Sequence, residues 1–480
     1  MSVEPIGVFT LVLGFYALSL GSAFTAALLV IMSIFGSAAA LVVGSASVPP
    51  AHLFLLFLVI SIVSGRTDLR PATAMLSVGK PGFWLAALVT YGAISAYFLP
   101  RLLSGETLIV PLGISEYPLT RGVVPLGPVS SNFTQPIYLL ADFVCFVAIS
   151  VIGSTSAGCR AIVNALIAYA ALNIGFALLD LATAATGTQD ALQFMRNAQY
   201  TFHENESVNG MKRIVGSWPE ASAFAGTTLG VLGFTGTLWL CGRTSRWQGF
   251  LAVASLLLIM LSTSSTGLVA TPVCLAIMYC TALSKCGTSQ ASGNATAFVL
   301  LSPLLLVVAT LVVILSNDLY GMLYEYVDIL VLSKATSNSG IARGAWNSFG
   351  MQNFWDSSGF GVGLGTARTS SFPIAVLSNV GVPGAIFFAT FAIAALTRMG
   401  NSPQTFERDV KLAARNGCLC LLVGGTVAGA TVDLGLLFFI LAGLAASRPV
   451  PSVEAAAPFL RLRQQSDGPA WVARNDHTLP

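Results

Sequence analysis

The residues most suited to chemistry lie in polar segments that interrupt an otherwise apolar chain. One segment, MKRIVGSWPEASAFAG from Met211 to Gly226, sets two cations, a Trp-Pro pair and a carboxylate directly before a long apolar run. The planar fork of arginine fits phosphate oxygens, so Arg213 is a candidate ligand for a diphosphate at a membrane surface. Its alternative role is to extend its charge to lipid headgroups. Glu220 could act in catalysis or could be only a favourable carboxylate at a helix start.

A second such segment runs from Ala342 to Gly384 and combines arginines with aromatic residues and glycines. Arg343 precedes Trp346, and Arg368 follows the glycine run GFGVGLG at 359–365. Aromatic rings beside arginines are suited to holding sugar rings, although an aromatic belt at a membrane interface gives the same pattern. The glycine run follows no predicted strand and opens no βαβ unit, which argues against a nucleotide-binding loop. We expect these glycines to allow a tight turn that brings Arg368 back to the membrane.

The composition predicts an all-α polytopic membrane protein. The chain has 480 residues, of which 55% are hydrophobic and 9% charged, and a mean hydropathy of +0.79. Apolar stretches of roughly 17–25 residues, the length that crosses a bilayer, recur along it. The first stretch lacks the basic start and cleavage site of a signal peptide, so we expect a retained span. We predict about 12 or 13 spans, near 6–21, 24–45, 50–64, 82–99, 136–154, 159–183, 218–240, 247–263, 264–284, 296–316, 371–397, 413–429 and 431–447.

The charge distribution predicts the orientation of these spans. Three long polar segments, at about 100–135, 184–217 and 317–370, fall on one side and carry 8 Lys/Arg against 14 Asp/Glu. The other side, with the short connections and the tail 448–480, carries 15 Lys/Arg against 6 Asp/Glu. By the positive-inside rule the short-connection side is cytoplasmic and the long loops face outward. We therefore expect one transmembrane domain over 1–447 and a cytoplasmic, disordered tail.

The centres of the predicted spans carry almost no polar residues. Asp142, Asp180, Glu220 and Asp433 are all predicted near the outward ends of their spans. A channel or transporter usually places such residues in mid-span, facing a pathway. The pattern therefore favours chemistry at the outer surface over passage through the membrane.

Several motifs in order resemble the O-antigen ligase and polymerase superfamily, with its exopolysaccharide polymerase branch the most similar. They are RIVGSWPEASAFA before a helix, LSTSSTGLVA two spans later, R-x-x-W in a long outward loop, GFGVGLGTARTSSF and LSNVGVPG. The resemblance covers about 100–385 and includes Pro100-Arg101 and the stretch PLGPVSSNFTQPIYLL from Pro125 to Leu140.

The resemblance implies an integral-membrane glycosyltransferase of GT-C-like architecture in the bacterial inner membrane. Such proteins transfer a growing glycan from undecaprenyl diphosphate to a hydroxyl of an incoming lipid-linked repeat unit, with inversion and without a metal or other cofactor. Ligases of the superfamily transfer it to a lipid A core instead. The implied partners are the lipid-linked oligosaccharides, membrane lipid, a chain-length regulator (a polysaccharide co-polymerase) and export machinery. No nucleic acid is expected.

The resemblance also implies roles for individual residues. Arg213 and Arg343 would hold the diphosphate and offset its developing charge. For the general base, Glu220 is the first candidate and His203 the second. The residues expected to bind substrate are Arg101, Arg121, Asn132, Gln135, Trp218, Trp346 and Arg368. Arg196 serves as an outward control whose replacement should be mild.

The chain departs from the ligases at one place. Ligases carry a His-Asn pair at the start of the helix after the large loop, where this chain has Arg368-Thr-Ser-Ser371. This difference favours a polymerase, with a ligase as one alternative. A lipid-linked oligosaccharide flippase or other transporter is another, and it predicts charged residues along a central cavity.

Overall fold

The computed structural model describes residues 2–44, 46–65, 67–198, 207–208, 210–242, 246–286, 292–397 and 406–448. Within these residues, eight helices are long and apolar enough to cross a membrane: α5 (Pro81–Leu102), α6 (Ser131–Ile152), α7 (Ser156–Thr186), α8 (Ala221–Leu240), α10 (Ser265–Cys286), α11 (Gly293–Leu315), α14 (Phe372–Thr397) and α15 (Phe406–Ala428). Five shorter apolar helices occupy the remaining predicted positions: α1 (Pro5–Leu20), α2 (Ser22–Met32), α3 (Pro50–Ser64), α9 (Arg246–Leu261) and α16 (Leu436–Ala446). The protein is thus a helical, multi-pass membrane protein, as predicted.

The predicted second span is too long. The helix expected over 24–45 ends at Met32, and the chain then forms strands β2 (Leu41–Val43) and β3 (Ala46–Val48), which join β1 (Ser2–Val3) in an antiparallel sheet. The cause is a close tertiary contact at Gly36, where a Cβ would lie 2.3 Å from the Trp218 ring. The Ser37 amide also donates to the Ser217 carbonyl at 3.1 Å. These contacts with a distant segment override the apolar composition.

The helix α6 begins earlier than predicted, at Ser131 instead of 136. Pro136 is the sixth residue of this helix and lacks the N–H that would bond the carbonyl four residues earlier, so the helix begins before it at the cost of one intrahelical hydrogen bond. The longer helix places Asp142 near its middle, and that side chain is fully buried. The prediction that Asp142 lies near a span end is therefore wrong.

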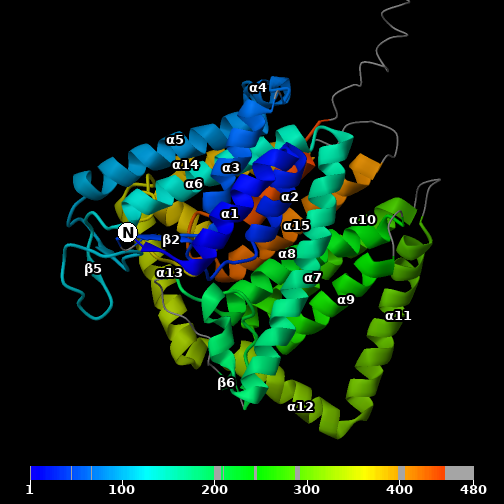
Figure 1. Ribbon diagram of the computed structural model, residues 1–480. Coiled ribbons are helices and arrows are strands. Elements are labelled where there is room, and N and C mark those ends of the chain that lie inside the picture. The colour runs from blue at the N-terminus through cyan, green and yellow to red at the C-terminus, as the bar shows by residue number, and fades with distance from the viewer. Residues whose placement is uncertain are drawn as a thin grey trace, which may run out of the picture.

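The centre of the bundle is the packing of α8 against α15. Leu421 lies against Gly230, and Cys420 and the Asn416 backbone lie against Gly233. The absence of side chains at the two glycines lets the helices approach closely. Around this pair, α2 packs on α7, α5 on α14 and α6 on α16. At the edge, α11 stands apart, and its central apolar window has no buried residue (Figure 1).

The glycine run makes the tight turn that the sequence predicts. Gly359, Gly361, Gly363 and Gly365 all have positive φ, between 81° and 102°. The run docks on a break in α14 at Gly381 (φ 59°, ψ −161°), where the Val382 amide donates to the Gly359 carbonyl at 2.8 Å. Both sides of this contact need a backbone that only glycine adopts without strain.

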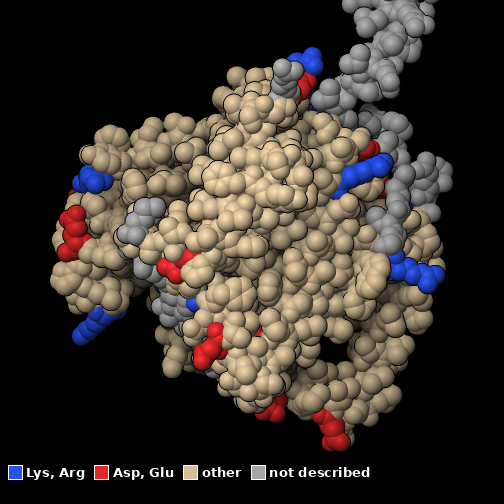
Figure 2. All heavy atoms as spheres, viewed as in Figure 1, with Lys and Arg blue, Asp and Glu red and all other residues tan. Residues whose placement is uncertain are grey.

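The three long polar segments gather at one end of the bundle, opposite the short helix α4 (Arg70–Leu76) (Figure 1). They contain β4 (Leu108–Ile109), β5 (Val124–Pro125), η1 (Gln189–Met195), β6 (Ser207–Val208), β7 (Met211–Lys212), α12 (Asn317–Val327), η2 (Asp328–Leu332), η3 (Ser333–Thr336) and α13 (Asn338–Asp356). The third segment is thus largely helical. Figure 2 shows a broad area without charged side chains across the middle of the visible face, as a membrane-spanning surface requires.

We expect Gly233→Ala to lower the midpoint temperature of thermal unfolding, because its methyl group would lie 2.9 Å from the Asn416 carbonyl oxygen. Overpacking of this kind costs about 1–3 kcal/mol. The matched control is Gly226→Ala on the same helix, whose methyl group meets no atom within 4 Å. Alanine there should stabilise the helix by up to about 1 kcal/mol. Intrinsic fluorescence of the purified protein measures both midpoints, and equal values would contradict the close α8–α15 packing.

Candidate functional site

Two residues that the sequence singles out meet at the end of the bundle. Glu220 is the extended residue that precedes α8, and Arg343 lies in the second turn of α13. Their side chains form an ion pair, with 3.7 Å between Arg343 Nη2 and Glu220 Oε1, and both remain partly exposed. The Ser222 hydroxyl donates to Glu220 Oε1, and it also accepts from Arg343 at 3.5 Å. A carboxylate and a guanidinium from distant segments thus share one solvent-accessible place.

Arg368 adds a second guanidinium to this place. Its charge lies over the Trp346 ring, 4.4 Å from the ring centroid, and its backbone amide donates to the Val110 carbonyl at 2.8 Å. Burial lowers the pKa of Arg368, the neighbouring Glu220 raises it and the neighbouring Arg343 lowers it. Because a guanidinium stays protonated at neutral pH, the group of two arginines and one glutamate carries a net positive charge. It can attract an anion.

A cavity of about 280 Å³ opens beside Arg343. Its polar lining comes from several elements: Lys334 on η3, Asn347 on α13, Ser265 on α10 and Ser370 before α14. Asn347 fixes the last of these, because its Oδ1 accepts from the Ser370 amide at 2.8 Å. The cavity combines two cations with hydroxyl and amide groups, a set that suits phosphate oxygens.

The sequence analysis missed Lys334, Asn347 and Ser370 as site residues. It weighed only arginines as outward cations, so Lys334 was passed over. The signal for α13 was present in the sequence, because Ser337 caps the helix by accepting from the Gly340 amide at 3.1 Å. A helix beginning there would have placed Arg343 and Asn347 one turn apart on the same face.

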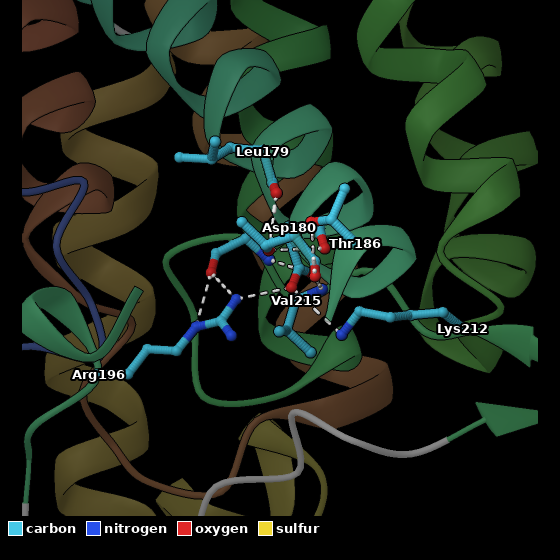
Figure 3. Close-up of polar contacts among 8 residues, drawn as sticks. Leu179, Asp180, Thr186, Arg196, Lys212 and Val215 are labelled. Atoms are coloured by element: carbon cyan, nitrogen blue, oxygen red, sulfur yellow. Dashed lines mark hydrogen bonds and ion pairs between the residues drawn. The ribbon is translucent and has the colours of Figure 1, made fainter. Parts of the chain in front are cut away.

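A buried carboxylate organises the chain before α8 (Figure 3). Asp180 of α7 accepts from Arg196 at 2.8 Å, forms an ion pair with Lys212 at 3.2 Å, and accepts from the Val215 and Gly216 amides at 2.9 and 3.2 Å. Arg196 also donates to the Gly216 carbonyl at 2.6 Å. This network fixes the backbone that leads to Trp218 and Glu220.

The expectation that Arg196 is a neutral control is therefore wrong. Its side chain is only 3% exposed, and it joins α7 to the segment before α8. A buried carboxylate needs such partners, because an uncompensated charge in an apolar interior is costly. An arginine in a long polar segment can thus serve the structure of the protein.

Arg213 lies next to Lys212, just after β7, and its side chain is half-buried. Among the described residues, the contacts of Glu220 and Arg343 are made with each other, Ser222 and Arg368, and Arg213 is not among them. The second candidate base, His203, lies outside the described residues, as does 449–480 of the predicted tail.

The remaining candidate residues lie around this end of the bundle in other contacts. Arg101 donates to the Tyr97 carbonyl of its own helix at 2.6 Å and lies over the Tyr97 ring. Arg121 is exposed in a turn with φ of 53°. Neither is brought to the Glu220–Arg343 pair by a described contact.

Asn132 and Gln135 support the glycine run. The Asn132 amide donates to the Leu364 carbonyl at 2.9 Å and to Thr366 at 2.8 Å, and Gln135 packs against Gly365. Trp218 packs on Gly36 and donates its indole N–H to Asn173 at 3.2 Å. These residues position the segments that carry Arg368 and Glu220.

No protein-family model matches this chain, and no curated protein shows significant sequence similarity to it. The function therefore has to be inferred from the residues and contacts of the site. The motif resemblance remains an expectation from the sequence.

We expect Arg196→Ala to lower the thermal unfolding midpoint by several degrees, because it removes one partner of a buried ion pair. Such a loss costs roughly 3–5 kcal/mol, and the lower end applies because Lys212 and two amides still face Asp180. The control is Arg160→Ala, an exposed arginine on the same helix, α7. Unfolding followed by fluorescence tests this, and an unchanged midpoint for Arg196→Ala would contradict a structural role.

Proposed function

We propose that the protein is a polysaccharide polymerase that joins undecaprenyl-diphosphate-linked oligosaccharide repeat units at the outer leaflet of the bacterial inner membrane. The observation that carries this proposal is the convergence of Glu220, Arg343 and Arg368 at one end of a membrane helix bundle. One carboxylate and two guanidinium groups are the residue types that glycosyl transfer from a diphosphate needs. They lie where a lipid-linked substrate would present its headgroup.

The chemistry divides between these residues. A hydroxyl oxygen of the acceptor attacks the anomeric carbon of the donor, and the bond from that carbon to the diphosphate oxygen breaks with inversion. Glu220 takes the hydroxyl proton as general base, and its ion pair with Arg343 holds the carboxylate at the site. Undecaprenyl diphosphate leaves with the bonding electrons, and Arg343 and Arg368 offset the charge that develops on it.

The cavity beside Arg343 provides further groups for the diphosphate. Lys334 supplies a third cation, and Ser265, Ser370 and Asn347 supply polar groups around it. Arg213, on the neighbouring segment, is retained from the motif resemblance as a diphosphate ligand. Trp346 holds the Arg368 guanidinium by a cation–π contact and limits its motion.

The proposed topology follows the positive-inside rule. The end of the bundle with α12 and α13 faces the periplasm, and the end with α4 and the tail faces the cytoplasm. The 13 apolar helices among the described residues would then contribute to a GT-C-like bundle, with the five shorter ones crossing the bilayer only in part. The partners would be the lipid-linked oligosaccharides, a chain-length regulator and the export machinery, and no metal or other cofactor takes part.

Deletion of the gene provides the first test. We expect single repeat units to accumulate on undecaprenyl diphosphate and secreted polymer to disappear, because the polymerase acts before export. Mass spectrometry of extracted lipid-linked glycans measures their size. Long polymer retained on the lipid would instead indicate a ligase, and loss of polymer with the single repeat units held at the cytoplasmic face would indicate a flippase.

Site variants in the complemented deletion strain provide the second test. We expect Arg343→Ala and Arg213→Ala to abolish detectable polymer, because loss of one such charge lowers the rate by about 10²–10³. Glu220→Gln should be similarly inactive, and Arg343→Lys should retain partial activity because it keeps the charge but not the fork. Arg160→Ala, on an exposed face at the other end, is the control, and immunoblots of membranes show insertion. Near-normal polymer from Arg343→Ala would refute the assignment.

A further inference from the structure

A second cavity lies at the same end of the bundle and takes no part in the chemistry above. It has a volume of about 280 Å³ and is lined by residues of α2, α3, α6, α8, α15 and α16 and of the segments that precede α3, α8 and α16. The volume is about nine times the ~30 Å³ of a water molecule and close to the lower limit of roughly 300 Å³ for small-molecule pockets. Trp218, two residues before Glu220, forms part of its wall. The cavity is thus adjacent to the proposed catalytic base.

Polar side chains line this cavity or lie behind its wall. His52 lines it, and both ring nitrogens of His52 are buried and have no hydrogen-bond partner among the described residues. Asp433 also lines it, and one of its oxygens accepts from the Gly435 amide. Asp142, one helical turn beyond Tyr138 on α6, is fully buried within electrostatic range of Asp433, and neither of its oxygens accepts a hydrogen bond from a described residue.

Unpartnered buried polar atoms of this kind are costly, at about 1–3 kcal/mol each. An apolar occupant would leave them unpaired, whereas an occupant with several hydroxyl groups would supply donors to the carboxylates and either role to the histidine. The groups therefore indicate a polar, hydrogen-bonding ligand.

The charge of the lining excludes an anion. No lysine or arginine lines the cavity among the described residues, while the Asp433 carboxylate does. A diphosphate or a carboxylated sugar would be repelled. A divalent metal is also disfavoured, because among the described residues no three His, Cys, Asp or Glu side chains are grouped to hold one.

Aromatic rings distinguish a sugar from a small cation or water alone. Tyr138 and Trp218 lie in the wall, and the rest of the lining is mostly apolar, with Phe35, Leu434 and Leu437 among it. Sugar rings present C–H faces to such surfaces and hydroxyl groups to carboxylates. We propose that this cavity is a binding subsite for one uncharged sugar residue of the glycan substrate. The identification of the sugar as part of a substrate rests on the proposed function.

Binding of simple glycosides to the full-length protein in lipid nanodiscs tests the subsite directly. The probes are the methyl glycosides of glucose, galactose, mannose and N-acetylglucosamine, with methyl glucuronoside as the anionic comparison. Saturation-transfer NMR is expected to detect at least one neutral glycoside and to show the glucuronoside bound at least tenfold more weakly, because of the nearby carboxylates.

Asp433→Asn and Tyr138→Phe are expected to weaken this binding about tenfold, since the first replaces a charged acceptor oxygen by an amide donor and the second removes a hydroxyl group from the wall. Thermal unfolding midpoints show whether each variant is folded, and His52→Gln provides a further variant if one is not. Arg343→Ala is the matched comparison. It should keep glycoside binding while losing polymer formation.

The outcomes separate the subsite from the proposed function. Absence of neutral glycoside binding to the native protein, equal binding of the glucuronoside, or binding unchanged in Asp433→Asn and Tyr138→Phe would each overturn the subsite. A pH-dependent effect of Asp433→Asn on polymer formation without glycoside binding would do the same and would indicate proton sharing among Asp142, Asp433 and His52. The native protein could instead bind a glycoside, lose this binding in the variants and yet form no polymer. That result would uphold the subsite and refute the polymerase function.

Discussion

The geometry of this end of the protein depends on one buried carboxylate. Asp180 accepts from a guanidinium and two backbone amides and pairs with a lysine, so its charge is compensated from several directions. Without those partners the charge would disfavour burial strongly, and with them it becomes an anchor for the chain that follows η1. Trp218 and Glu220 take their positions from that anchor. They are thereby held against α2 on one side and α13 on the other.

Two electrostatic environments result, and they differ in sign. Around Arg343, the cations outnumber the carboxylates and remain partly exposed, which suits a ligand that arrives from solution or from the membrane surface. Around Asp433, one carboxylate and a histidine face a cavity with no lysine or arginine in its described lining. Trp218 belongs to the wall of the cavity around Asp433 and lies two residues before Glu220, which pairs with Arg343. A substrate with a charged end and an uncharged end could therefore be oriented by charge alone.

Composition and charge were sufficient to predict much of the fold. Each of the 13 apolar helices among the described residues overlaps a span that hydropathy predicts, and the tight turn of the glycine run follows from the residue type. The second helix was predicted too long because the contact of Gly36 with Trp218 is tertiary and leaves no local signal. Hydropathy alone could not show the helix α13, since it is not an apolar helix, and its signal in the sequence is the capping residue Ser337.

The site was predictable in its residue types but not in its pairings. Glu220 and Arg343 were chosen for their chemistry, and the structure brings them together although they lie far apart in the chain. Arg196 was misjudged because an arginine in a buried pair and one on a surface look alike in sequence. Asp142 was misplaced because the start of α6 was set at the proline, although a proline near a helix start does not prevent the helix from beginning earlier.

The Asp180 network also has a consequence for biogenesis. Its contacts span only 16 to 36 residues of chain, so they close loops of low entropic cost and can form soon after α7 enters the membrane. The contact of Arg343 with Ser222 spans 121 residues and must wait until α9 to α13 have been synthesised. During synthesis the Asp180 network can therefore form first, and the segment that carries Arg343 is added later. A chain interrupted between these events would hold Glu220 in place without the guanidinium that faces it.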